Sequence, residues 1–245
     1  MELYSSTAST NDICLDLCRE AQKEGAVVIT DTQTAGRGRL GRSWISPPEQ
    51  NVYMSILLRP DMQPKTSSII TLMSSVACIK AIKRLASIAN AHIKWPNDIM
   101  LGSKKAGGIL TESRIEGAKL SCVVVGIGLN VNMPSSQIPQ KTNIPATSIL
   151  AETGTIINRS ELAAAIIQET EKYYLLLKTH GIAAIIDTWT SMTKMIGSQI
   201  TVCRSEGDIS GTAEGLDKEG RLLLRQPNRK LITILSGDVK VTSYD

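Results

Sequence analysis

A short stretch near the N-terminus combines glycine and arginine at a density that suits anion binding. Residues 32–44 read TQTAGRGRLGRSW and include Arg37, Arg39 and Arg42. Glycines let the backbone approach a ligand and present N–H groups to an anion, and arginines add forked, permanently charged donors. The spacing is neither that of a Walker A loop nor that of a dinucleotide fingerprint. The stretch therefore predicts an anion-binding loop, with a plain surface loop as the alternative.

Two lysine-bearing segments follow on neighbouring predicted strands. KWPND occupies residues 94–98 and KKAGGIL occupies residues 104–110. If these strands pair, the ammonium groups of Lys94 and Lys105 reach one site, beside Asp98 at the turn between them. Taken singly, such a lysine is more often a solvated surface residue, and such an aspartate a turn former. The assignment therefore gains weight only beside the arginine-rich loop.

Two further segments are less specific. Residues 123–132 read VVVGIGLNVN, and glycines inside a strand, here Gly126 and Gly128, mark either a bulge or the close approach of a ligand. A packing role fits them equally well. Residues 9–12 read STND, for which a helix N-cap is the simpler interpretation.

The elements that would position these residues are predicted from apolar spacing and from turn formers. Apolar residues at helical spacing predict a helix over 67–85. The other helices are expected over 9–25, 158–180 and 182–192. Strands are expected over 27–30, 52–59, 92–95, 99–101, 106–116 and 119–131. Tight turns, rather than crossover helices, join most of these strands, so the sheet is expected to be largely antiparallel. The doubly apolar run in 119–131 predicts a central strand.

The pattern changes after residue 197. Short strands are expected over 199–204, 208–216, 222–226, 230–235 and 239–242. Such short, closely spaced strands are typical of a small β-barrel. We therefore predict two domains, over residues 1–194 and 195–245.

Composition limits the class of protein. The chain has 245 residues, 42% of them hydrophobic and 20% charged, which is typical of a globular protein. No apolar run approaches the roughly 20 residues of a membrane span. The five cysteines show no CxxC spacing and there are only two histidines, so neither a disulfide framework nor a zinc site is expected, and a reducing cytoplasm fits best. The net charge of +4 is concentrated locally, which favours a small anionic ligand over a long polyanion.

Taken in order, TQTAGRGRLGRSW, KWPND, KKAGGILTES and VVVGIGLNVN resemble the motifs of the biotin–protein ligase family, also called biotin–[acetyl-CoA-carboxylase] ligases. The resemblance covers nearly the whole chain. It implies an α+β fold, with a mixed, largely antiparallel sheet and helices related to class II aminoacyl-tRNA synthetase cores. It also implies a small SH3-like β-barrel at the C-terminus. Some relatives carry an N-terminal helix-turn-helix, but the STND segment begins at residue 9, so we expect a monofunctional ligase.

The family's activity is implied by the same resemblance. Such ligases activate biotin with Mg-ATP to biotinyl-5′-AMP and pyrophosphate, then transfer biotin to one lysine of a biotin carboxyl carrier protein. Residues 1–194 would be the catalytic domain. The chain would act in the cytoplasm, as a monomer or homodimer, with neither nucleic acid nor membrane as a partner.

The matched motifs also imply roles for individual residues. The biotin-binding residues would be Ser9, Thr10, Asn11, Gln33, Gly36, Arg37, Gly38, Arg39, Lys105, Gly108, Gly126 and Gly128. The nucleotide-binding residues would be Arg37, Arg39, Arg42, Trp44, Lys105 and Asn130. The catalytic residues would be Arg37, Arg39, Lys94, Asp98 and Lys105, with Asp98 orienting the acceptor lysine. No residue is assigned to bind a metal.

Three other functions are weighed against this one. A lipoate or octanoate ligase shares the fold and the chemistry, but the polar residues expected around the ring favour biotin. A nucleic-acid-binding module with an arginine–glycine loop would bind in a steeply salt-dependent manner without ATP, yet few aromatic residues lie nearby for base stacking. A catalytically silent adenylate sensor is disfavoured because Arg39 and Lys105 are intact.

Overall fold

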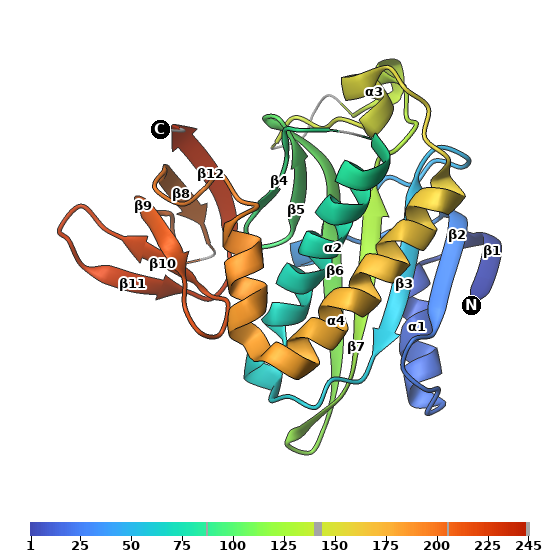
Figure 1. The fold of residues 1–245 in the computed structure, drawn as a ribbon, viewed down its shortest axis with the longest axis horizontal. Coiled ribbons are helices and arrows are strands. Elements are labelled where there is room, and N and C mark those ends of the chain that lie inside the picture. Colours follow the sequence, from blue (N-terminus) through green and yellow to red (C-terminus); the bar gives the residue numbers. More distant parts are fainter. Residues whose placement is uncertain (87, 140–143, 205, 244–245) are drawn as a thin grey trace.

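The larger of two sheets provides the frame of the molecule. The computed structural model describes residues 1–86, 88–139, 144–204 and 206–243. Seven strands lie in the order β1-β2-β3-β7-β6-β5-β4 (Figure 1). They span Glu2–Thr7 (β1), Val27–Gln33 (β2), Val52–Leu58 (β3), Ala91–Lys94 (β4), Asp98–Leu101 (β5), Lys104–Glu116 (β6) and Lys119–Leu129 (β7). Only the β1–β2 pair is parallel among the described strands, so the prediction of a largely antiparallel sheet is confirmed.

The predicted central strand is β7, the fourth of the seven strands. Val123 and Val125 belong to the main hydrophobic core, whereas Cys122 and Val124 belong to a smaller core on the other face. Alternate residues of a strand point to opposite faces of the sheet, so both faces of β7 are covered. This double burial is why the strand has an uninterrupted apolar sequence.

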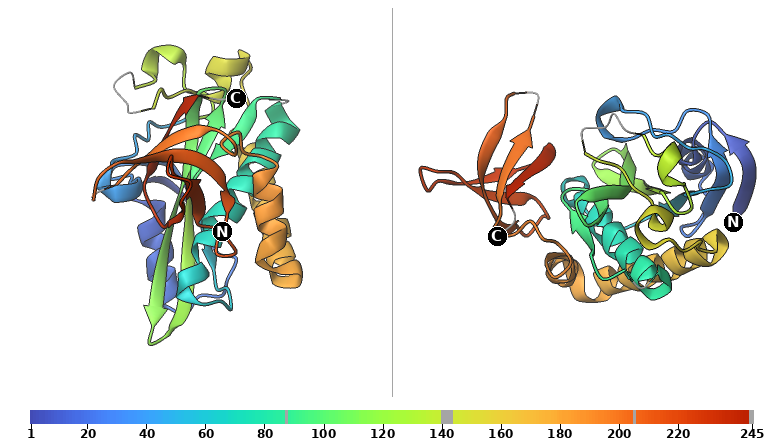
Figure 2. Two further views of the ribbon diagram at one scale, coloured as in Figure 1. Left: turned by 90° about the vertical axis from the view of Figure 1, so that its left-hand side faces the viewer. Right: turned by 90° about the horizontal axis from the view of Figure 1, so that it is seen from above.

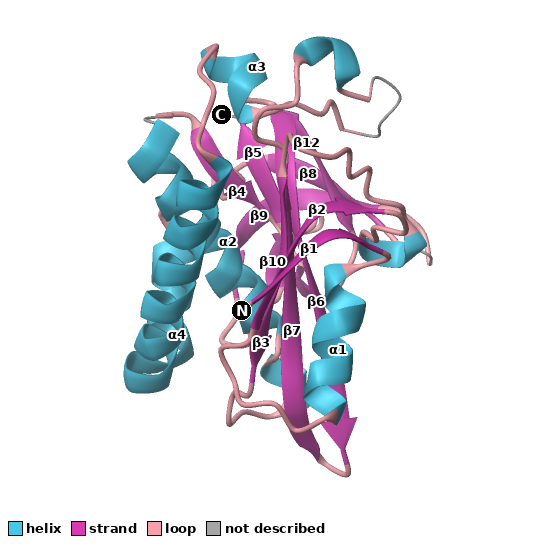
Figure 3. Cartoon of the chain, turned by 90° about the vertical axis from the view of Figure 1, so that its right-hand side faces the viewer, coloured by secondary structure: helices cyan, strands magenta, loops and turns pink. Residues whose placement is uncertain are grey.

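Helices cover the two faces of the sheet unequally. The long helices α2 (Ser68–Ala86) and α4 (Arg159–Thr190) lie side by side on one face (Figure 1). The shorter α1 (Thr10–Arg19) lies on the opposite face (Figure 3). As the sequence predicts, α4 begins after an Asn158 cap and is interrupted at Gly181, where φ is 77°.

Some boundaries differ from the sequence predictions. Helix α1 ends at Arg19 rather than near residue 25, because Ala21 leaves the helical conformation with a φ of 56°. The edge strand β1 and the short helix α3 (Ile149–Thr153) were not predicted. Strand β1 pairs with β2 but keeps mostly exposed side chains, so it has no apolar alternation to reveal it.

The C-terminal strands form a second sheet, which is drawn in orange to red in Figure 2. Its strand order is β11-β10-β9-β8-β12. They span Gln199–Cys203 (β8), Ile209–Leu216 (β9), Leu222–Arg225 (β10), Leu231–Ile234 (β11) and Asp238–Ser243 (β12). All five strands were predicted. Among the described residues no pairing joins β11 to β12, so hydrogen bonds do not close this sheet into a ring.

A turn of the second sheet contacts the domain that holds the larger sheet. The turn between β9 and β10 presents carbonyl oxygens to the larger domain. Gly220 O accepts a hydrogen bond of 3.3 Å from the indole of Trp95, and Glu219 O accepts one of 3.1 Å from the Ser68 hydroxyl.

The expectation of no disulfide is wrong. Cys18 in α1 and Cys122 in β7 are bonded, across a sequence separation of 104 residues. The sequence holds no spacing signal for such a pair, because helix packing on the sheet brings the two residues together. The neighbouring Cys14 is buried and unbonded, as predicted for a core residue, and burial raises the pKa of its thiol to about 12. Within the described residues, no helix is long and apolar enough to span a membrane.

Candidate active site

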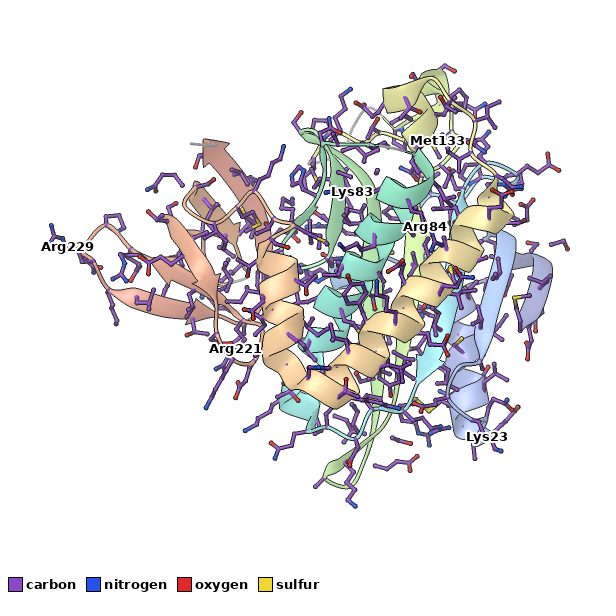
Figure 4. All side chains as sticks on the ribbon, in the orientation of Figure 1. Lys23, Lys83, Arg84, Met133, Arg221 and Arg229 are labelled. Carbon is purple, nitrogen blue, oxygen red and sulfur yellow. A yellow bond between two sulfur atoms is a disulfide. The ribbon has the colours of Figure 1, made fainter. Side chains whose placement is uncertain are left out.

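The predicted site residues converge on one cavity of about 380 Å³. It lies between the N-terminus of α1, the arginine-rich loop, the first half of β6, the end of β7 and the start of β12. Met133, labelled in Figure 4 at the end of the molecule that carries α3, also lines it. The predicted residues that line it are Ser9, Thr10, Asn11, Gln33, Arg37, Gly38, Arg39, Arg42, Trp44, Asp98, Lys105, Gly108, Gly126, Gly128 and Asn130. Only Gly36 and Lys94 of the predicted set do not.

Buried polar groups at the N-terminus of α1 form one end of the cavity. The Thr10 amide donates to Gln33 Oε1 at 3.0 Å, and the Thr10 hydroxyl lies 2.7 Å from the Ser55 hydroxyl. Ser9 occupies the N-cap position but makes no side-chain capping bond. This end of the cavity can therefore offer hydroxyl and amide groups to a polar ring, in a place where unpaired groups would be costly.

The glycines of β7 are required by the close approach of protein side chains. A Cβ at Gly126 would overlap the Asn11 amide, and one at Gly128 would lie 2.6 Å from the Trp44 indole. The Trp44 Nε1 is buried and has no hydrogen-bond partner among the described residues. The glycines thus allow Asn11 and Trp44 to pack against the strand, and an unsatisfied donor remains at the cavity.

A buried carboxylate sits between two lysines. Asp98 Oδ1 lies 2.5 Å from Lys105 Nζ, and Asp98 Oδ2 lies 2.9 Å from Lys94 Nζ. Burial raises the pKa of Asp98, but the ammonium groups of Lys105 and Lys94 outweigh it, so the net effect is a lowered pKa. Asp98 is thus held as a carboxylate that fixes the position of Lys105 at the cavity.

Lys94 meets Lys105 at Asp98, as the sequence predicts, although strand β5 lies between their two strands. Its ammonium group is buried beneath Asp98 and donates to the backbone oxygen of Val239 at 3.1 Å. It does not line the cavity, so direct contact with a ligand in the cavity is not part of this arrangement. Lys94 instead links Asp98 to the second sheet.

The three arginines of the loop have different environments. Arg37 makes a bidentate pair with Asp12, at 2.7 and 2.8 Å, and hydrogen bonds to this carboxylate raise the pKa of Arg37. Arg39 is the more buried, lies 3.3 Å from Asn97 Oδ1, and has its pKa lowered mainly by burial. Arg42 pairs with Asp238 of β12. Arg37 therefore has structural partners, and its role as an anion ligand stays a prediction.

The remaining predicted residues have structural partners as well. Gly36 O accepts from the Trp44 amide at 2.8 Å, closing the loop behind the cavity wall. Asn130 Nδ2 donates to Thr147 O at 2.9 Å, which holds the segment after β7 in place. Gly108 lies close to the Lys105 side chain.

The residues near the cavity that were not assigned a function from the sequence include Ser55, Asn97, Glu112 and Asp238. Asn97 and Glu112 lie inside the quoted motifs KWPND and KKAGGILTES, so their positions offered a signal. Ser55 sits in an apolar strand, and Asp238 belongs to a distant segment. Neither has a local pattern that points to the cavity.

Comparison with known proteins is decisive for the family. Residues 3–130 match the model of the biotin/lipoate A/B protein ligase family, and residues 195–241 match that of the biotin protein ligase C-terminal domain. The chain belongs to the biotin/lipoate A/B protein ligase family. The resemblance noted from the motifs is thereby confirmed.

Relatives of this ligase match over most of their length. The bifunctional ligase/repressor BirA of Bacillus subtilis is 37% identical over 96% of this chain and 71% of its own. The biotin–[acetyl-CoA-carboxylase] ligase of Paracoccus denitrificans is 30% identical over 92% of this chain and 94% of its own. The biotin protein ligase from Aquifex aeolicus, solved with biotin and ATP, superposes with a TM-score of 0.81 at 27% identity, covering 98% and 99% of the two chains.

Proposed function

We propose that this ligase activates biotin with Mg-ATP and transfers it to a lysine of a biotin carboxyl carrier protein of the acetyl-CoA carboxylase type. The observation that carries the proposal is the cavity, which joins a polar pocket at the start of α1 to the cationic groups of Arg39, Arg42 and Lys105. Relatives named as biotin ligases match this chain over both sheets.

In the first step, an oxygen of the biotin carboxylate attacks the α-phosphorus of ATP. A bond forms between that oxygen and phosphorus, the bond from the α-phosphorus to the bridging oxygen breaks, and pyrophosphate leaves. No general base is needed, because the carboxylate is already ionised at neutral pH. Lys105 and Arg39 would hold the two anions together and stabilise the charge that develops.

In the second step, the amine of the carrier lysine attacks the carbonyl carbon of biotinyl-5′-AMP. The amide bond forms, the bond to the phosphate oxygen breaks, and AMP leaves while the amine loses a proton. Asp98 is held as a carboxylate beside Lys105 and would orient the incoming ammonium or amine. The loop carrying Arg39 would shield the mixed anhydride from water.

The described residues fit a magnesium ion that arrives with the nucleotide. They contain no cluster of three or more acidic, histidine or cysteine side chains that could hold a metal. Mg²⁺ often binds through substrate phosphates with few protein ligands, and there it offsets the charge of the triphosphate.

The polar pocket favours biotin over lipoate. Thr10, Ser9 and Gln33 offer groups that match the donors and acceptors of a ureido ring, whereas a dithiolane ring carries no N–H or C=O group to bond them. A site that hydrogen-bonds one substrate discriminates against an analogue that lacks the matching groups. Selectivity for biotin is therefore expected to arise at the binding of the ring.

The remaining features of the proposal concern the whole chain. We place the ligase in the cytoplasm because ATP is its substrate, with no nucleic-acid partner and a monomeric or homodimeric state. Residues 1–194 would form the catalytic domain and residues 195–245 the C-terminal domain, consistent with the two sheets.

The test is mass spectrometry of the purified chain with Mg-ATP and either biotin or lipoate, with and without a biotin carboxyl carrier domain. We expect biotinyl-5′-AMP without the carrier and a biotin-sized mass gain on the carrier. Lys105→Ala should lower adenylate formation by about a hundredfold. Lys104→Ala, at the neighbouring exposed lysine that pairs with Glu152, is the control and should not. Activity with lipoate alone, or with neither acid, would overturn the proposal.

A further inference from the structure

Glu112 of β6 lies between two parts of the cavity wall. Its Oε2 accepts a hydrogen bond of 2.6 Å from Asn11 Nδ2 and lies 3.1 Å from Arg37 Nη2. Asn11 belongs to the polar pocket at the start of α1, and Arg37 stands at the root of the arginine-rich loop. One carboxylate therefore touches both the proposed ring site and the proposed adenylate site.

The Asn11 amide is oriented by three protein groups. Its Nδ2 donates to Glu112 and, at 3.3 Å, to Leu110 O, while its Oδ1 accepts from the Ser55 hydroxyl at 2.6 Å. Because the amide packs against Gly126, where a Cβ would overlap it, this orientation also sets the shape of the cavity wall. Among the hydrogen bonds of the Asn11 side chain to described residues, the bond to Glu112 is the shorter of the two from Nδ2 and the only one to a charged group.

Arg37 is held from two sides. Asp12 binds it in bidentate fashion from α1, and Glu112 binds it from β6. Asp12 directly follows Asn11, so α1, β6 and the loop meet in one cluster of charged and amide groups. Moving the Arg37 guanidinium would alter the environment of the carboxylate that orients Asn11.

We propose that Glu112 is a positioning residue that couples the ring pocket to the arginine-rich loop. It keeps Asn11 in the orientation that the ring needs, and through Arg37 it holds the loop where Arg39 meets the adenylate. This inference rests on the proposed function, because it assigns a role within the same site.

Two substitutions test the charge and the contacts of Glu112. Glu112→Gln keeps one oxygen that can still accept from Asn11 and Arg37, but it removes the negative charge and places an amide donor at the Oε1 position, which lies 3.4 Å from Arg37 Nη2. Glu112→Ala removes both contacts. Glu116→Gln is the matched control, since Glu116 lies on the same strand, is exposed, and pairs only with Arg114 among the described contacts. Thermal unfolding of each variant shows whether it remains folded.

Two readouts are needed: biotin affinity of the ligand-free chain by calorimetry, and the half-life of preformed biotinyl-5′-AMP on the chain. We expect Glu112→Gln to keep biotin affinity within about twofold while shortening the half-life by about threefold to tenfold. Glu112→Ala should impair both, and Glu116→Gln neither.

The outcomes that would overturn the inference are specific. A normal adenylate half-life in Glu112→Gln would remove the link to the loop, even if Glu112→Ala does not fold. Unchanged biotin affinity in a folded Glu112→Ala would remove the link to the pocket. If the unmodified chain binds biotin but forms no adenylate, the proposed function fails, whereas the calorimetric comparison still tests the pocket contact.

Discussion

Most of the charged side chains around the cavity are already paired with protein groups. Arg37 is bound by carboxylates, Lys105 is bound by Asp98, and Arg42 is bound by Asp238. Such pairing fixes the side chains in one geometry, so little ordering is needed when the ligand binds. The proposed reaction itself needs no side chain in an unusual protonation state. The chemistry joins two anions, which calls for placed positive charge rather than for a proton acceptor.

The Asp98 carboxylate gives a prediction about pH. Its pKa is lower in the folded chain than the ordinary value of 3.8, because two lysines outweigh the effect of burial. A lowered folded-state pKa means that its contribution to the free energy of unfolding is complete above the ordinary pKa and is lost as the pH falls through the folded value. We expect Asp98→Asn to cost about 3 kcal/mol at pH 7, where it leaves the lysines uncompensated.

Denaturant unfolding between pH 3 and pH 8 measures this difference. The difference in the free energy of unfolding between the wild-type chain and Asp98→Asn should be constant down to about pH 5 and should become smaller below about pH 4. A gap that widened on acidification would contradict a stabilising ionised Asp98. Asp61, which is exposed, provides the control substitution Asp61→Asn, for which no gap is expected.

Among the helices and strands, the sequence predicts those whose apolar residues follow a recognisable pattern. The apolar spacing of α2 and the doubly buried run of β7 both appear in the structure as expected. Strand β1 was missed because its pairing with β2 leaves most of its side chains exposed, without alternation. The Cys18–Cys122 bond was missed because it depends on how α1 lies on the sheet, which no local pattern records.

This disulfide gives a prediction about two elements. It fastens α1, which carries the polar pocket residues, to the central strand β7. Cross-linking residues about 100 positions apart stabilises a chain by up to about 4 kcal/mol. Under denaturing, non-reducing conditions we expect alkylation of Cys14, Cys78 and Cys203 only, and of all five cysteines after reduction.

A stability comparison completes this test. Reductant should lower the melting temperature of the unmodified chain but leave Cys18→Ser unaffected. Cys203→Ser removes an unbonded cysteine of the second sheet and should behave like the unmodified chain. Alkylation of five cysteines before reduction would show that the bond is not formed.

At the scale of the whole molecule, the two sheets meet at the site itself. Asp238 and Val239, at the start of β12, contact Arg42 and Lys94. The sequence predicted both sheets and gathered most of the cavity residues through four motifs. It did not predict that a C-terminal strand would contact the cavity, because no motif spans the two regions. Nor did it predict the contact of Lys94 with Val239, which lies 145 residues away.

Lys94 allows a test of how the sheets are held together. Lys94→Met removes a buried donor to Asp98 and to Val239 O, and leaves Asp98 with one fewer compensating charge. We expect a loss of about 3 kcal/mol in the free energy of unfolding and faster hydrogen exchange in β12. Lys104→Met, at a half-exposed lysine, serves as control and should change neither. Unaltered exchange in β12 of the Lys94 variant would contradict this link.

The contacts of β12 have a consequence for recombination between ligases. A C-terminal module grafted from a distant relative would have to present a backbone carbonyl to Lys94 and an acid to Arg42 in the same register as Val239 and Asp238. Exchanging the module therefore also exchanges part of the support beneath Asp98. In hybrids that fail to match at these two positions, each domain should still fold, but the side chains of Lys94, Asp98 and Arg42 should be less well ordered.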